Sequence, residues 1–260
     1  MAANDAPRAT SGTLTIHMWS TRVIWLLAGL AGSSALSSGL HVEFARALTT
    51  VVWWLAIASG FIALMAAGAP GLTVVRLVAP ALPVSAVIFW FSGASATTGA
   101  IAVATTSVAS LLALSGEVAE AMVQAGAYGE ERRFPLRTPA GVLLAASVVW
   151  VVWYGCTASA VVLLCHRQWI AGVVVAIASG AMKVLVLSRM HRLSNRWLVL
   201  VPAGLVVRDP LVLGETLMVQ RSNLAAIGLA LADTGAADLT GPASGVAVEI
   251  GVTEMVTVLF

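Results

Sequence analysis

The stretch Ser188-Arg-Met-His-Arg-Leu-Ser-Asn-Arg-Trp197 divides this chain into two parts of different character. Before it lie long apolar runs with few charges, and after it lie short segments of alternating polarity that are separated by turn residues. The stretch itself is basic, as is typical of the cytoplasmic edge of a membrane protein. We therefore predict a transmembrane domain over residues 19–187 and a small cytoplasmic β-rich domain over residues 188–260.

The composition is that of a membrane protein. Of the 260 residues, 59% are hydrophobic and only 10% are charged, whereas about a quarter of the residues of soluble domains are charged. Residues 1–194 hold eleven basic and six acidic residues, but residues 195–260 hold three basic and six acidic ones. Because the only part large enough to form a soluble domain is acidic, nucleic acid is excluded as a partner.

Six apolar runs are long enough to cross a bilayer, which takes about 20 helical residues each. A serine-rich stretch weakens the first run, and whether it spans is left open. With six spans, the basic residues gather on the side of the N-terminus, so both termini are expected in the cytoplasm of a bacterial plasma membrane. The predicted spans are residues 23–40, 46–68, 72–91, 96–115, 141–165 and 169–187, with a cytoplasmic N-terminal segment at 1–18 and a cytoplasmic loop at 117–139.

Two local patterns modify this helical bundle. Pro80 and Pro83 each lack a backbone N–H, so the third span should kink or break there, either to improve packing or to line a transport path. Gly172, Ala176 and Gly180 recur every four residues and predict a flat stripe for close helix packing. The stripe has two alternative partners, another subunit and a helix of the same bundle.

Arginines at the predicted cytoplasmic edge are the candidate contact residues. We expect them to bind lipid headgroups or a protein partner, since a charged arginine side chain is costly to place in the bilayer core. In the third span, Arg76 lies near a helix end and is expected to extend its side chain to the nearby surface. The six candidates are Arg132, Arg133, Arg137, Arg189, Arg192 and Arg196.

The tail is predicted to be β-rich because its apolar residues are β-branched or alternate with polar ones. Turns are expected at Pro202-Ala-Gly204, Asp209-Pro210 and Asp233-Thr-Gly235, and residues 223–231 fit either a strand or a short helix. The predicted strands are residues 197–201, 204–208, 215–221, 245–250 and 254–260.

Two family resemblances extend these predictions. The segments Trp197–Arg208 and Thr216–Ile227 resemble the opening strands of bacterial PH-like domains that follow membrane helices, which implies a PH-like tail. The segments Ala127–Arg137 and Arg196–Gly204 resemble those of actinobacterial multi-pass membrane proteins of unassigned function, which implies a plasma-membrane setting.

No catalytic constellation, cofactor motif or metal-ligand set is present in the sequence. His41-Val-Glu43 is best interpreted as a polar turn, and Cys156 and Cys165 are spaced so that they point to opposite sides of one helix. No Asp or Glu lies inside a predicted span, which disfavours ion-coupled transport. We therefore expect no cofactor, and the sequence favours a non-enzymatic role over an enzymatic one.

Three hypotheses about function remain. The first is a non-enzymatic assembly component, for example in cell-envelope biogenesis, which binds a protein partner through its tail or associates with itself. The second is a small-solute transporter or channel subunit, with Thr105 or Thr106 on the wall of its path. The third is an envelope-lipid enzyme, in which Glu117, Glu120, Arg132 and Arg133 would converge on one pocket.

Overall fold

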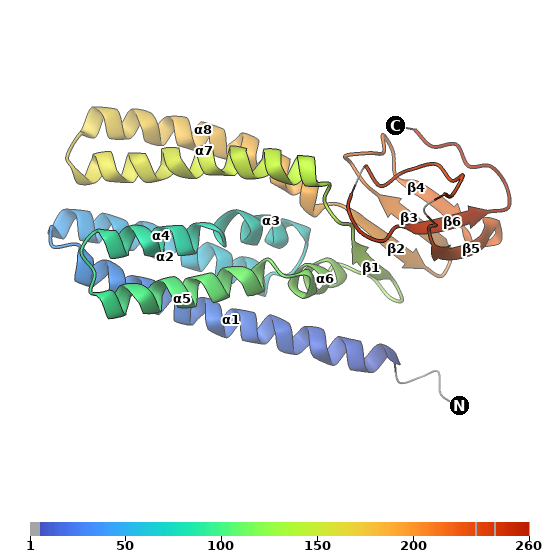
Figure 1. Ribbon diagram of the computed structural model, residues 1–260, viewed down its shortest axis with the longest axis horizontal. Helices are drawn as coiled ribbons and strands as arrows, with labels where there is room; N and C mark the ends of the chain where they lie inside the picture. Colours follow the sequence, from blue (N-terminus) through green and yellow to red (C-terminus); the bar gives the residue numbers. More distant parts are fainter. Residues whose placement is uncertain (1–5, 232, 242, 260) are drawn as a thin grey trace.

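The protein is an elongated bundle of helices with a β-sheet region at one end (Figure 1). A computed structural model describes residues 6–231, 233–241 and 243–259. Its α-helices are α1 (Ala6–Gly39), α2 (Glu43–Met65), α3 (Ala69–Val78), α4 (Ala81–Phe91), α5 (Ala96–Ala113), α6 (Gly116–Gln124), α7 (Ala140–Cys165) and α8 (Trp169–Ser194). Its strands are β1 (Arg132–Pro135), β2 (Trp197–Val201), β3 (Gly204–Arg208), β4 (Leu217–Gln220), β5 (Leu224–Leu229) and β6 (Val248–Val252).

The described residues contain six helical segments that are long and apolar enough to cross a membrane, with α3 and α4 together forming one of them. Helices are the expected form because lipid offers the backbone no hydrogen-bond partners. The first segment begins at Leu14, earlier than predicted, and the last continues to Ser194. Residues 188–194 are therefore the last turns of α8, and the change from helix to strand occurs between Ser194 and Trp197.

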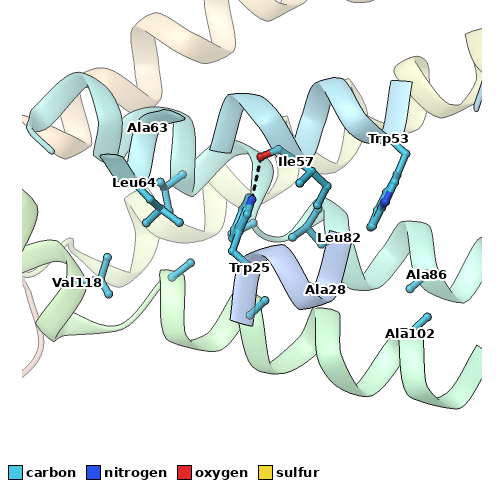
Figure 2. Close-up of a cluster of buried hydrophobic side chains, with 14 of the residues drawn as sticks. Trp25, Ala28, Trp53, Ile57, Ala63, Leu64, Leu82, Ala86, Ala102 and Val118 are labelled. Carbon is cyan, nitrogen blue, oxygen red and sulfur yellow. Dashed lines mark hydrogen bonds between the residues drawn. The ribbon is translucent and has the colours of Figure 1, made fainter. Parts of the chain in front are cut away.

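The core of the bundle is centred on a reciprocal contact between α1 and α2 (Figure 2). The indole Nε1 of Trp25 on α1 donates a 2.9 Å hydrogen bond to the carbonyl of Ile57 on α2. In return, Nε1 of Trp53 on α2 donates a 2.9 Å bond to the carbonyl of Gly29 on α1. Each ring fills the space above a glycine of the other helix, Trp25 above Gly60 and Trp53 above Gly32.

The first sheet is an antiparallel meander in the order β1-β2-β3-β4. Its strands β2 and β3 are joined by a tight turn at Pro202 and Ala203, and Val201 pairs with Gly204. Gly204 has a φ of 152°, and a Cβ atom there would lie 2.1 Å from the carbonyl of Val219, so β4 can approach only a glycine at this position.

A second, two-stranded sheet is formed by β5 and β6. Of the two alternatives for residues 223–231, a strand or a short helix, the structure has the strand, and a single 3-10 turn at Arg221–Asn223 precedes it. The strand predicted at 245–250 begins later, at Val248. The strand predicted at 254–260 is wrong for the described residues 254–259, which form no strand pairing.

Candidate functional site

The loop between the fourth and fifth membrane segments contributes a strand to the C-terminal sheet. Strand β1 pairs with β2, with Arg133 opposite Val199 and Pro135 opposite Trp197. The amide of Leu136 donates a further 3.1 Å hydrogen bond to the carbonyl of Arg196. Part of the segment predicted as a loop at 117–139 therefore ties the C-terminal sheet to the helical bundle at a second point of the chain.

A buried ion pair lies where α8 gives way to β2. Arg196 donates from Nε to Oδ1 of Asp209 at 2.7 Å and from Nη2 to Oδ2 at 2.6 Å. The two side chains are only 2% and 3% exposed. The Nη1 atom of Arg196 also donates to the carbonyl of Arg137 at 2.9 Å, and Oδ1 of Asp209 accepts from the amide of Leu211. Each side-chain nitrogen of Arg196 and each carboxylate oxygen of Asp209 thus has a hydrogen-bond partner, which is the condition for burying two charges.

The last turn of α8 is held by a side chain from α3. Arg76 donates to the carbonyl of Leu193 and to Oγ of Ser194, both at 3.2 Å. One turn earlier, Nδ1 of His191 lies 3.0 Å from Oγ1 of Thr73. The final carbonyls of a helix lack amide donors and carry partial negative charge, so a guanidinium is favourable there. Arg76 therefore caps a neighbouring helix, which differs from the predicted extension to the surface.

Together these contacts form a joint between bundle and sheet. By the joint we mean β1, the last turn of α8, and the Arg196–Asp209 pair. Asp209 is the functional residue that the sequence interpretation missed, because an Asp before Pro210 is the ordinary signature of a turn. The joint fixes the sheet relative to the membrane helices by backbone pairing and by a buried ion pair.

Two of the six predicted contact arginines, Arg133 and Arg196, are not exposed. Arg196 is buried in the joint, so in this structure it cannot reach headgroups or a partner. Arg133 is half-buried, pairs with Glu131 at 2.8 Å and lies over the ring of Trp197 at 5.9 Å. Hydrogen bonds from the side chain of Arg133 and the amide of Tyr128 lower the pKa of Glu131. The exposed arginines are Arg132, Arg137, Arg189 and Arg192.

The third span is interrupted between Val78 and Ala81, at Pro80. Two aromatic side chains of α7 contact it on either side of the interruption. Trp150 donates from Nε1 to the carbonyl of Leu77 at 2.9 Å, and the hydroxyl of Tyr154 lies 2.8 Å from that of Ser85. The two rings are stacked with centroids 5.2 Å apart. The aromatic face of α7 therefore packs against the interruption and gives Leu77 a hydrogen-bond donor there.

Replacing Trp150 with phenylalanine should weaken this contact measurably. The variant keeps a ring for stacking on Tyr154 but loses the bond to Leu77, which in membrane proteins is worth about 0.6–1.5 kcal/mol. The matched control is Trp153→Phe, since Nε1 of Trp153 is buried and has no hydrogen-bond partner among the residues that the structure describes. Denaturant unfolding of both variants in detergent measures the difference. Equal destabilisation by the two substitutions would contradict a role for the indole N–H of Trp150.

The three residues of the predicted packing stripe differ in burial. Gly172 is buried, and a Cβ atom there would lie 2.7 Å from the side chain of Leu164 on α7. Ala176 and Gly180 are exposed, and nothing lies within 4 Å of the Cβ position at Gly180. Gly172 therefore packs against α7, whereas the other two residues of the stripe face outward.

The residues named in the transport and enzyme hypotheses make the following contacts in the described part of the chain. Thr106 is fully buried and donates to the carbonyl of Ala102 on its own helix, and Thr105 likewise donates to Ile101. Among the described residues, Glu117 and Glu120 form no ion pair with Arg132 or Arg133, and no group of three His, Cys, Asp or Glu side chains could hold a metal ion. The four charged residues of the proposed lipid pocket are thus not joined by ion pairs in the described part of the chain.

The comparisons with known proteins give no match: no protein-family model, curated protein or solved structure is significantly similar to this chain.

Proposed function

We propose that this protein is a non-enzymatic assembly component of the bacterial plasma membrane that binds a protein partner through its cytoplasmic sheet and the exposed arginines beside it. The joint is the observation that carries this function. A tail that needed only to stay near the membrane could follow a flexible linker, whose residues make no fixed contacts. A sheet held by β1 and by the buried Arg196–Asp209 pair instead presents one surface in one orientation, which lowers the entropic cost of binding a partner.

Charge supports a cytoplasmic location for the sheet. The end of the bundle that carries the sheet also carries the exposed arginines of β1, of the following loop and of the last turns of α8 (Figure 1). At the opposite end, the three helix connections and adjacent helix starts contain only two basic residues other than histidine, Arg46 and Arg167. Basic residues are retained on the cytoplasmic side of bacterial membranes, so their distribution favours the sheet end as the cytoplasmic one.

The β2–β3–β4 meander supports the proposal that the tail is PH-like.

Purification from native membranes in mild detergent tests this function. We expect a specific protein to co-purify with the full chain and to be lost when residues 195–260 are deleted. Because that deletion also removes the pairing partner of β1, a second variant that leaves this pairing intact is needed. It replaces the four exposed arginines Arg132, Arg137, Arg189 and Arg192 with alanine, which changes side chains at the joint but keeps the backbone pairing of β1 and the Arg196–Asp209 pair, and it should reduce recovery of the partner severalfold.

The matched control changes two arginines at the other end of the bundle. Arg46→Ala combined with Arg167→Asn removes exposed positive charge there, and asparagine tolerates the φ of 59° at position 167. This control should leave the partner bound. If the deleted chain recovers the same proteins as the full chain, the proposed function is wrong.

A further inference from the structure

Strand β4 is an edge of the first sheet. Among the described residues it pairs with β3 alone, and Leu205 lies opposite Val219. The amide of Arg221 donates to the carbonyl of Ala203, so residues 217, 219 and 221 direct their backbone groups toward β3. By alternation, residues 216, 218 and 220 direct theirs to the open side. Such an edge is a template for another extended strand.

An extended segment of the same chain lies along this edge without pairing to it. Residues Glu215–Met218 and Val256–Leu259 line the two sides of one shallow hollow. The segment is held at both ends: Asn223 accepts from the amide of Glu254 at 2.6 Å, and the amide of Gly214 donates to the carbonyl of Leu259 at 2.8 Å. Between these two contacts the segment forms no strand.

The burial of the segment matches that of a strand beside β4. Val256 and Val258 are half-buried, whereas Thr257 and Leu259 are exposed. If pairing continues from the Gly214–Leu259 hydrogen bond, Val256 lies opposite Leu217, and both are half-buried. The same register places the backbone of residue 257 opposite residue 216, just before β4, and that of residue 255 opposite residue 218 of β4. Both positions direct their backbone groups to the open side.

We infer that the open edge of β4 is a strand-acceptor site and that residues 255–259 occupy it as a displaceable fifth strand. The occupant is the chain's own segment, which is already aligned antiparallel, is held at both ends and has the correct alternation of burial. Resting on the proposed function, this inference specifies the partner: it contributes an extended, alternating apolar segment that replaces residues 255–259. The segment thereby protects the edge from unspecific pairing until that partner binds.

A peptide added in trans tests the acceptor site directly. The probe is a fluorescent peptide of residues 254–259 with two added C-terminal lysines, and the receptor is the chain that ends at Glu254, in detergent. We expect the peptide to bind saturably to the shortened chain. Its affinity for the full chain should be lower by about tenfold or more, because the tethered segment competes at high effective concentration. Circular dichroism checks that the shortened chain remains folded.

Two methylated peptides provide the matched control. Methylation of the backbone nitrogen of residue 257, which faces β4 in the inferred register, should weaken binding about tenfold, since it removes a donor and blocks close approach. Methylation at residue 258, whose N–H faces away, should leave binding nearly unchanged. Equal effects at the two positions, equal binding to both chains, or binding to neither would each overturn the inference. Co-purification of a partner with the shortened chain is scored separately, so the proposed function can survive failure of the strand site.

Discussion

Replacing Asp209 with alanine is expected to release the C-terminal sheet from the membrane helices. The substitution leaves the side chain of Arg196, which is 2% exposed, without its carboxylate partner, and breaking a buried ion pair in this way costs about 3–5 kcal/mol. The carbonyl of Arg137 remains as a partner but carries no full charge. Hydrogen exchange of β1 and β2 should therefore accelerate strongly, while exchange within α1 and α2 should stay unchanged.

Two further variants test whether the effect of Asp209→Ala comes from leaving a buried charge unpaired or from any substitution near the joint. In the double variant Arg196→Met with Asp209→Leu no charge is left buried, so it should retain most of the protection in β1 and β2. Glu131→Ala removes the carboxylate of the half-buried pair with Arg133, whose side chains are 26% and 20% exposed, and solvent-accessible pairs contribute about 0–1 kcal/mol. If Asp209→Ala has no larger effect than Glu131→Ala, the joint is not held by the buried pair.

Introducing valine at Gly60 is expected to disrupt the packing of α1 against α2. A Cβ atom at Gly60 would lie only 2.1 Å from the indole of Trp25, which is completely buried, so the ring has no room to move away. Overpacking of this kind costs about 1–3 kcal/mol, and more where backbones must separate. Loss of the hydrogen bond from Trp25 to Ile57 would add to it. A fall in the melting temperature of the purified protein in detergent measures the effect.

The control for Gly60→Val is the same change at Gly180. Nothing lies within 4 Å of the Cβ position at Gly180, so valine there should have little effect on the melting temperature. In a Trp25→Ala background, Gly60→Val should lower the melting temperature much less than it does in the unchanged chain, because the smaller side chain makes room for valine. Similar losses from Gly60→Val and Gly180→Val would contradict the reciprocal packing of α1 and α2.

The membrane helices could be predicted from the sequence because each depends on a local property. About 20 apolar residues in succession predict a span whatever surrounds them, and the six candidate segments of the structure correspond to the six predicted runs. The turn at Pro202 and Ala203 was also predictable, since it depends on a short local pattern. The end of α8 was misplaced because Arg189 and Arg192 were interpreted as a boundary, although arginine is a good helix former.

Strand β1 was not predictable from the loop that contains it. Its four residues, Arg132–Pro135, include two arginines and a proline, so neither β propensity nor alternation indicates a strand. The segment becomes a strand only because β2 offers its edge. The two arginines were consequently assigned to headgroups or a partner, whereas Arg133 packs on Trp197 beside Glu131.

A signal for the reciprocal contact was present in the sequence. The segments Trp25-Leu-Leu-Ala-Gly-Leu-Ala-Gly32 and Trp53-Trp-Leu-Ala-Ile-Ala-Ser-Gly60 share Trp, Leu, Ala and Gly at the same four positions. In two adjacent antiparallel helices this spacing lets each Trp lie over the Gly of the other helix. The repeat indicates the contact only once α1 and α2 are known to be neighbours, which apolar composition alone does not establish.

The sequence by itself determined that the chain is a membrane protein with six apolar helical segments and a β-rich tail, because hydropathy and turn chemistry act between near neighbours. Only the tertiary structure decided how the tail is attached. Its contacts join Arg196 to Asp209, 13 positions apart, and Arg76 to Leu193, 117 positions apart. Whether such side chains meet depends on how the helices and strands pack together, and on the high cost of leaving a charge or a carbonyl unpaired once they are buried.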